Sequence, residues 1–193
     1  MRLRTVLDLG RFRVDDSSML YSKRAIRLTG VVLLLVCCVG CDQLTKRVAQ
    51  ARLKGRPTSS FFGDLFRLQY AENPGAFLGL GGQIPASARP LILIGINVVI
   101  TLGLLAAIVF GGRMTPARLA GCALLLSGAL GNLIDRMRFD GLVIDFMNLG
   151  IGPLRSGIFN VADVAIMLGA GLLVLPMQAA TEDDSPKREP ASA

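Results

Sequence analysis

Four apolar stretches close to membrane-spanning length constrain this chain more than any other feature. They cover roughly residues 28–48, 90–110, 119–134 and 158–175. A helix needs about 20 consecutive apolar residues to cross the hydrocarbon core of a bilayer, and these stretches reach or approach that length. Charged residues make up only 18% of the chain, which is low for a soluble domain. We therefore expect an all-α integral membrane protein folded as a four-transmembrane-helix bundle.

Polar segments divide the chain into a membrane core and two tails. We expect residues 1–26 to form a basic cytoplasmic extension, 27–176 the core, and 177–193 a polar cytoplasmic tail. Two polar loops, at about 49–89 and 136–157, lie on the side opposite the tails. The first contains FFGDLFRLQYAEN, whose partial alternation and aromatic residues favour short strands, and the second favours a strand or a short interfacial helix. A small β-containing region is therefore expected in the external loops.

Basic residues before the first apolar stretch indicate the orientation. There are seven of them: Arg2, Arg4, Arg11, Arg13, Lys23, Arg24 and Arg27. The positive-inside rule places this segment in the cytoplasm, and four spans then bring the other terminus to the same side. The net charge of +7 is explained by this segment and by attraction to anionic lipid. We expect membrane lipids as partners and no binding of nucleic acid.

Polar residues within the apolar stretches gather at the outer end of the predicted bundle. They are Asp42 and Lys46 in the first stretch, Asn132 and Asp135 in the third, and Asn160 and Asp163 in the fourth. Residues three apart share a helix face, and the Asn-x-x-Asp spacing occurs twice. Ionisable groups at membrane depth are costly, which makes a functional site the default expectation.

The chain has no histidine, and this limits the chemistry of such a site. Ser-His-Asp triads, Cys-His dyads and histidine-based zinc sites are excluded in their usual forms. The four cysteines lie in apolar segments and are expected to be packing residues rather than disulfide partners. Carboxylates remain. Two close carboxylates share one proton, so the ionised partner activates water while the protonated partner polarises a carbonyl. We expect neither a metal nor a cofactor.

Five short blocks, taken together, resemble those of lipoprotein signal peptidase, also called signal peptidase II. In chain order they are DQLTK (42–46), NPGAF (73–77), GNLIDR (131–136), VIDF (143–146) and FNVAD (159–163). The resemblance extends over roughly residues 28–176. It implies a bacterial inner-membrane aspartic endopeptidase, with its site near the periplasmic face, that cuts prolipoproteins before a diacylglyceryl-modified cysteine. We expect it to be a monomer.

The resemblance also implies roles for individual residues. Asp145 and Asp163 correspond to the catalytic pair of the family. The supporting or substrate-binding positions are Asp42, Lys46, Asn73, Asn132, Asp135, Arg136 and Asn160. The interval between Asp135 and Asp145 is one residue longer than usual in the family, and Asp140 is expected to be a solvated acid in that insertion.

Structural roles are alternatives for several of these residues. Asp163 is placed to cap a helix, and Asp42 and Lys46, four apart on one helix, are placed to form a salt bridge. Asn73 precedes Pro-Gly, which is strong turn chemistry. These roles do not exclude a place in the site.

Two other functions fit parts of the pattern. Intramembrane acids also mark the ion paths of a small proton-coupled transporter, for which Asn97 and Thr101 are the only deeper polar residues in spans two to four. The segment CVGCD resembles a lipobox ending at Cys41, which raises the alternative that the chain is itself a lipoprotein. Three further apolar stretches after Cys41 argue against that alternative.

Overall fold

The computed structural model describes residues 16–75, 85, 87–112 and 114–174. Its helices and strands, in chain order, are α1 (Asp16–Leu53), β1 (Ser59–Phe61), β2 (Phe66–Asn73), α2 (Arg89–Phe110), α3 (Pro116–Arg138), β3 (Val143–Ile151), β4 (Leu154–Arg155) and α4 (Val161–Val174). The predicted tail 177–193 and the first part of the predicted extension 1–26 lie outside the described residues. The described part of that extension, from Asp16, belongs to α1.

Three of the described helices are long and apolar enough to cross a membrane. They are Ala25–Leu53 within α1, Arg89–Phe110 and Pro116–Arg138. The fourth, α4, is apolar but has 14 described residues, which at about 1.5 Å per residue give roughly 21 Å of helix. The expected positions of the apolar segments are therefore confirmed, while a fourth full span remains a prediction.

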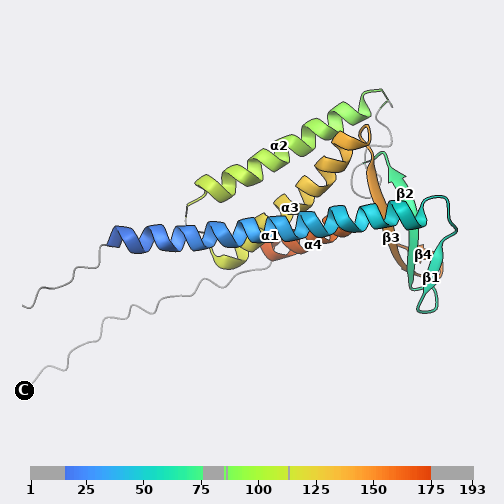
Figure 1. Cartoon of the computed structure of the whole chain (residues 1–193), viewed down its shortest axis with the longest axis horizontal. Helices are drawn as coiled ribbons and strands as arrows, with labels where there is room; N and C mark the ends of the chain where they lie inside the picture. Colours follow the sequence, from blue (N-terminus) through green and yellow to red (C-terminus); the bar gives the residue numbers. More distant parts are fainter. Residues whose placement is uncertain (1–15, 76–84, 86, 113, 175–193) are drawn as a thin grey trace, which may run out of the picture.

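The helices run alternately toward and away from a small sheet at one end of the bundle (Figure 1). Helix α3 lies at the centre and packs against α1, α2 and α4. Its start is fixed by Thr115, whose side chain accepts a hydrogen bond from Arg118 N, and by Pro116 in the first turn. The ends of α1 and α3 and the start of α4 consequently meet beside the sheet.

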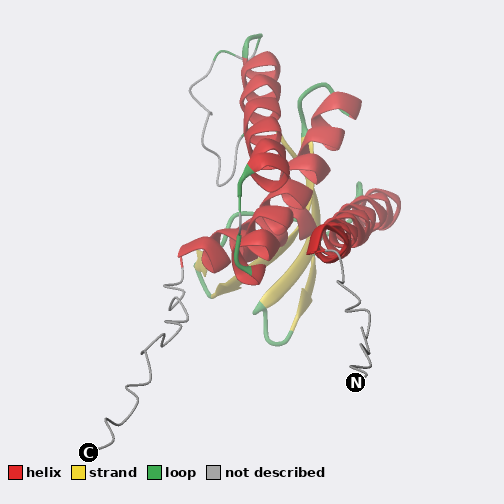
Figure 2. Ribbon diagram, turned by 90° about the vertical axis from the view of Figure 1, so that its left-hand side faces the viewer, coloured by secondary structure: helices red, strands yellow, loops and turns green. Residues whose placement is uncertain are grey.

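The sheet is antiparallel and has the order β1-β2-β3-β4. Seen along the bundle in Figure 2, its strands lie behind the helices. Strands β1 and β2 come from the predicted loop 49–89, and β3 and β4 from the loop 136–157. The expected all-α class is not confirmed, because the two loops pair into one sheet. The β2–β3 pairs join residues that are 70 to 83 positions apart in sequence.

Glycines allow α3 and α4 to approach closely. A Cβ added at Gly169 of α4 would lie 2.7 Å from the carbonyl oxygen of Gly121 in α3 and 2.8 Å from Leu125 N. Both neighbours are backbone atoms and cannot turn aside. The contact therefore requires glycine at position 169, as in the small-residue interfaces that are common between membrane helices.

We expect Gly169→Ala to lower the Tm of the purified protein in detergent, because the added methyl group forces α4 away from α3 at a cost of about 1–3 kcal/mol. Gly171→Ala is the matched control on the same helix, since its added Cβ would meet no atom within 4 Å. Equal Tm values for the two variants would contradict the close packing of α3 on α4.

Candidate active site

A buried cluster centred on Lys46 joins α1 to α3. Its ammonium nitrogen lies 2.9 Å from a carboxylate oxygen of Asp42 and 2.9 Å from one of Asp135. It also donates a hydrogen bond to Asn132 Oδ1 at 3.0 Å. Lys46, Asp42 and Asp135 are each 2% exposed or less. An ammonium group has three donors, and all three have an acceptor here.

The two acids of this cluster connect it to the other elements of the site. Asp42 Oδ1 accepts a hydrogen bond of 2.9 Å from Ala162 N in the first turn of α4, where a negative charge is favoured by the helix dipole. Asp135 Oδ2 accepts one of 3.1 Å from Ile144 N of β3. A Cβ at Gly131 would lie 2.6 Å from Asp42 Oδ2, so a larger residue there would displace the Asp42 carboxylate.

Asn160 and Asp163 begin α4 with a reciprocal pair of hydrogen bonds. Asp163 N donates to Asn160 Oδ1 at 2.9 Å, and Asn160 N donates to Asp163 Oδ2 at 3.1 Å. This is the geometry of a capping box. The capping alternative for Asp163 is therefore present in the structure, but it uses only one carboxylate oxygen. The other, Oδ1, accepts a hydrogen bond of 3.0 Å from Asn132 Nδ2.

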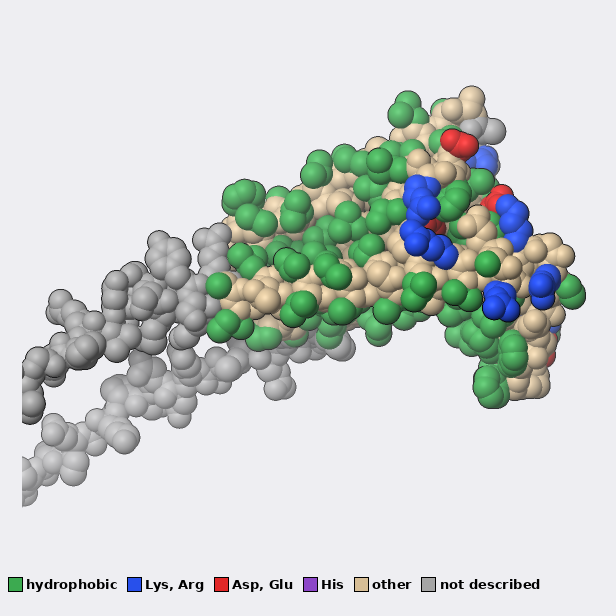
Figure 3. Space-filling model, in the orientation of Figure 1, with side chains coloured by type: hydrophobic (Ala, Val, Ile, Leu, Met, Phe, Trp, Pro, Cys, Tyr) green, Lys and Arg blue, Asp and Glu red, His purple; other side chains and the backbone are tan. Residues whose placement is uncertain are grey.

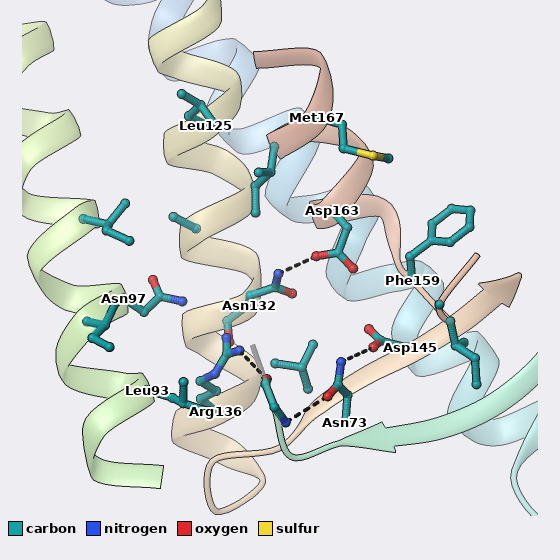
Figure 4. Close-up of a pocket in the computed structure, with 18 of the residues that line it drawn as sticks. Asn73, Leu93, Asn97, Leu125, Asn132, Arg136, Asp145, Phe159, Asp163 and Met167 are labelled. Carbon is teal, nitrogen blue, oxygen red and sulfur yellow. Dashed lines mark hydrogen bonds between the residues drawn. The ribbon is translucent and has the colours of Figure 1, made fainter. Parts of the chain in front are cut away.

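Asp145 lies on β3 and is held from both sides. Its Oδ2 accepts a hydrogen bond of 2.8 Å from Asn73 Nδ2, and its Oδ1 accepts one of 2.7 Å from Asn160 Nδ2. Asn160 Nδ2 also donates to Asn132 Oδ1 at 3.1 Å. An unbroken chain of side-chain hydrogen bonds thus runs from Asp163 through Asn132 and Asn160 to Asp145. Figure 4 shows its first bond, from Asn132 to Asp163.

Asn73 serves the turn and the site together. Its Oδ1 accepts a hydrogen bond of 2.9 Å from Gly75 N, as the Asn-Pro-Gly sequence predicts, while its amide nitrogen binds Asp145. Arg136 fixes the same turn to α3 by donating to Gly75 O at 3.2 Å and to Asn132 O at 3.3 Å. All nine residues expected from the sequence therefore belong to one connected group.

The two carboxylates Asp145 and Asp163 line a common cavity of about 610 Å³ (Figure 4). Asn73, Asn132 and Arg136 contribute the other polar groups near them. Most of the remaining wall is apolar and comes from α2, α3 and α4, including Leu93, Ile96, Ile100, Leu104, Leu125 and Ile166. A largely apolar cavity with a few convergent polar groups is the usual form of a binding site for small or extended ligands.

Burial dominates the acidity of Asp145. Removal of the carboxyl from water raises its pKa from an ordinary 3.8 to about 6, the hydrogen bond from Asn73 opposes this rise, and the negative charge of Asp163 adds to it. A carboxyl with this pKa changes its protonation state close to neutral pH. That property suits a general acid or base.

Gln43 is a member of the site that sequence reasoning missed. Its amide nitrogen donates to Asp135 Oδ1 at 2.9 Å, to Gly131 O at 3.2 Å and to Asp42 Oδ2 at 3.2 Å. Its position beside Asp42 in DQLTK was the available signal. Asp140, by contrast, lies exposed in the turn after α3 with a φ of 52°. Within the described ranges, no group of three or more Asp, Glu, Cys or His residues is arranged to hold a metal ion.

Comparison with known proteins decides the family. Residues 34–178 match the family model of signal peptidase (SPase) II. The chain belongs to the signal peptidase II family. It is 36% identical over 142 residues to the lipoprotein signal peptidase of Moorella thermoacetica, which covers 74% of this chain and 88% of that protein. It is 35% identical over 149 residues to that of Syntrophus aciditrophicus, covering 77% and 88%.

A solved structure described as a bacterial membrane enzyme, determined by the in meso method, has a similar fold. The TM-score is 0.67 at 25% sequence identity, covering 86% of this chain and 95% of that one. The chain is accordingly a peptidase and a multi-pass bacterial membrane protein. The known catalytic type of its family is aspartic, and the family removes signal peptides from prolipoproteins. Membership of a peptidase family favours hydrolysis over the transporter and lipoprotein alternatives.

We expect Lys46→Met to destabilise the protein strongly, because it leaves two buried carboxylates without their cation. Breaking a buried ion pair costs about 3–5 kcal/mol, which corresponds to a fall in Tm of roughly 10 °C for a chain of this size. Lys54→Met is the matched control, since Lys54 and Glu72 form an exposed ion pair of 2.7 Å. A Lys46→Met protein as stable as the Lys54→Met protein would contradict the central place of this cluster.

The raised pKa of Asp145 predicts a loss of stability with rising pH. Between about pH 4 and pH 6 the unfolded chain ionises this carboxyl while the folded protein keeps it protonated. At about 1.4 kcal/mol for each pKa unit, the folded state loses about 3 kcal/mol across this window. Thermal unfolding in detergent at several pH values should show a smaller fall in Tm for Asp145→Asn than for the wild type. Parallel curves would exclude a raised pKa.

Proposed function

We propose that this chain is an aspartic endopeptidase that cleaves prolipoproteins immediately before a diacylglyceryl-modified cysteine, with Asp145 and Asp163 as the catalytic pair. The observation that carries the proposal is the chain of hydrogen bonds between these two buried carboxylates through Asn132 and Asn160. Such a chain fixes two acids, from different elements, on one cavity.

In the proposed mechanism the pair holds one proton between its two members. The ionised carboxylate takes a proton from a water molecule, whose oxygen attacks the carbon of the scissile amide. The protonated carboxyl donates a hydrogen bond to the carbonyl oxygen and stabilises the negative charge that develops there. The C–N bond then breaks as the amine accepts a proton from the pair, which releases the new amino terminus and restores the starting proton count.

The environment of the pair supports this division of roles. Asp145 accepts hydrogen bonds from Asn73 and Asn160, and Asp163 accepts them from Asn132 and the Asn160 backbone. These donors orient both carboxylates before substrate arrives. The low polarity of the surrounding cavity strengthens each electrostatic contact with the developing charge.

The apolar wall of the cavity suits the proposed substrate. A signal peptide and the acyl chains of a diacylglyceryl group are both apolar, and much of the wall is formed by aliphatic residues from α2, α3 and α4. The polar groups stand at the sheet end of the bundle, where a cleavage site just outside the hydrocarbon core would lie. We further propose a monomer in the bacterial inner membrane, with cytoplasmic termini and the site near the periplasmic face.

We expect Asp145→Asn and Asp163→Asn each to reduce cleavage of a purified prolipoprotein by roughly 10²–10⁴-fold, the usual effect of losing a general acid or base. Asp140→Asn is the matched control, because Asp140 is an exposed acid in the turn between α3 and β3, the strand that carries Asp145. The assay follows the size of the prolipoprotein, and Tm is measured in parallel to establish folding. Normal processing by either of the first two folded variants would disprove the catalytic assignment.

A further inference from the structure

At the end of the sheet away from the candidate site, the pairing of the strands gives one apolar face and one polar face. Phe61 pairs with Phe66, and Phe66 pairs with Leu149, so these three side chains project from the same face. Ile151 is two residues beyond Leu149 on β3 and therefore projects from that face too. Leu154 pairs with Ile151 and extends it across β4.

The opposite face carries a polar network. Ser60 pairs with Arg67, and Arg67 pairs with Asn148, which places these residues on the other side of the sheet. Asp64 accepts hydrogen bonds of 2.6 Å from both Ser60 and Arg67. Arg155 donates to Asn148 Oδ1 at 2.5 Å and to Asp64 O at 2.8 Å. The described polar side chains of this face are thus joined into one hydrogen-bonded network.

The apolar face is exposed where the sheet extends beyond the helices. We define the sheet-tip patch as Phe61, Phe62, Leu65, Ile151 and Leu154, all of them exposed hydrophobic residues. Phe62 is 83% exposed, Leu154 81% and Ile151 77%. Figure 3 shows hydrophobic side chains gathered on the side of this overhang that faces back toward the bundle. In water such a patch is a liability, so a contact that covers it is expected.

The direction of the helices identifies what covers the patch. Helices long enough to span a membrane run up to the sheet, which lies across their ends (Figure 1). The part of the sheet beside the bundle consequently overhangs the lipid that surrounds the helices. On α1, which also runs up to the sheet, Leu44 and Val48 are exposed as well.

We propose that the sheet-tip patch inserts into the interfacial layer of the bilayer leaflet on the site's side and anchors the sheet to lipid. Aromatic and aliphatic side chains favour this layer, in which interfacial segments bury their apolar faces ~5–10 Å deep. The polar network of the opposite face then remains in water.

The anchor has a consequence for the site. Asp145 projects from the same face of β3 as Leu149 and Ile151, because alternate residues of a strand share a face. Fixing the tip at the lipid surface therefore fixes the height of Asp145 relative to the bilayer. The anchoring role does not rest on the proposed chemistry and is tested without measuring cleavage.

The chain contains no tryptophan, so a single introduced tryptophan reports its own surroundings. We would reconstitute the full-length Phe62→Trp variant in phosphatidylcholine–phosphatidylglycerol vesicles and measure fluorescence quenching by lipids brominated on the acyl chain. The matched control is Ser60→Trp, two residues away on an exposed position of the polar face. We expect quenching to be about twofold or more stronger for Phe62→Trp, as interfacial burial requires.

Leu154→Trp is a second probe on a different strand and should behave like Phe62→Trp, which keeps the proposal testable if one variant fails to fold. Equal, water-like emission from the patch and control variants would overturn the proposal. Quenching that appears only after a prolipoprotein is added would assign the patch to substrate instead. Quenching that depends on the protein-to-lipid ratio would assign it to a second copy of the chain.

Discussion

The buried ammonium group of Lys46 is the interaction on which the sheet end of the molecule depends. It binds two carboxylates, Asp42 and Asp135, that would otherwise repel each other within a membrane protein. Each carboxylate then reaches a further element, α4 through Ala162 N and β3 through Ile144 N. One charge thus connects three helices and strand β3. If the Lys46 ammonium group were removed, both buried carboxylates would lose the positive charge that offsets the cost of taking them out of water.

The same cluster leads directly to the candidate catalytic pair. Asn132 accepts a hydrogen bond from Lys46 and donates one to Asp163, while Asn160 bridges Asn132 to Asp145. The groups that hold the helices together are therefore also the groups that orient the two acids. In the proposed mechanism stability and chemistry share residues, so variants of Lys46 or Asn132 should affect both. This coupling explains why so many polar groups are tolerated at one end of an apolar bundle.

Local sequence signals predicted much of this arrangement. Hydropathy predicted helices at 90–110 and 119–134, close to the observed α2 and α3. It succeeds because a helix that crosses a bilayer needs a continuous run of apolar residues. Spacing and alternating direction brought Asp42, Asn132 and Asp163 to one end. The register of β2 on β3 was not predictable, since it depends on pairing between loops far apart in sequence. Gln43 was missed for a similar reason: two of its three acceptors lie on α3, and helix spacing alone does not identify them.

The proposed mechanism requires Asp145 and Asp163 to act as one unit on a single water molecule. Single-turnover cleavage of a prolipoprotein by Asp145→Asn, Asp163→Asn and the double variant tests it most directly. Residues that act as a unit are strongly non-additive, so we expect the double variant to be no slower than the slower single variant. If instead the two losses multiply, the carboxylates act independently, and a shared-proton pair linked through Asn132 and Asn160 is contradicted.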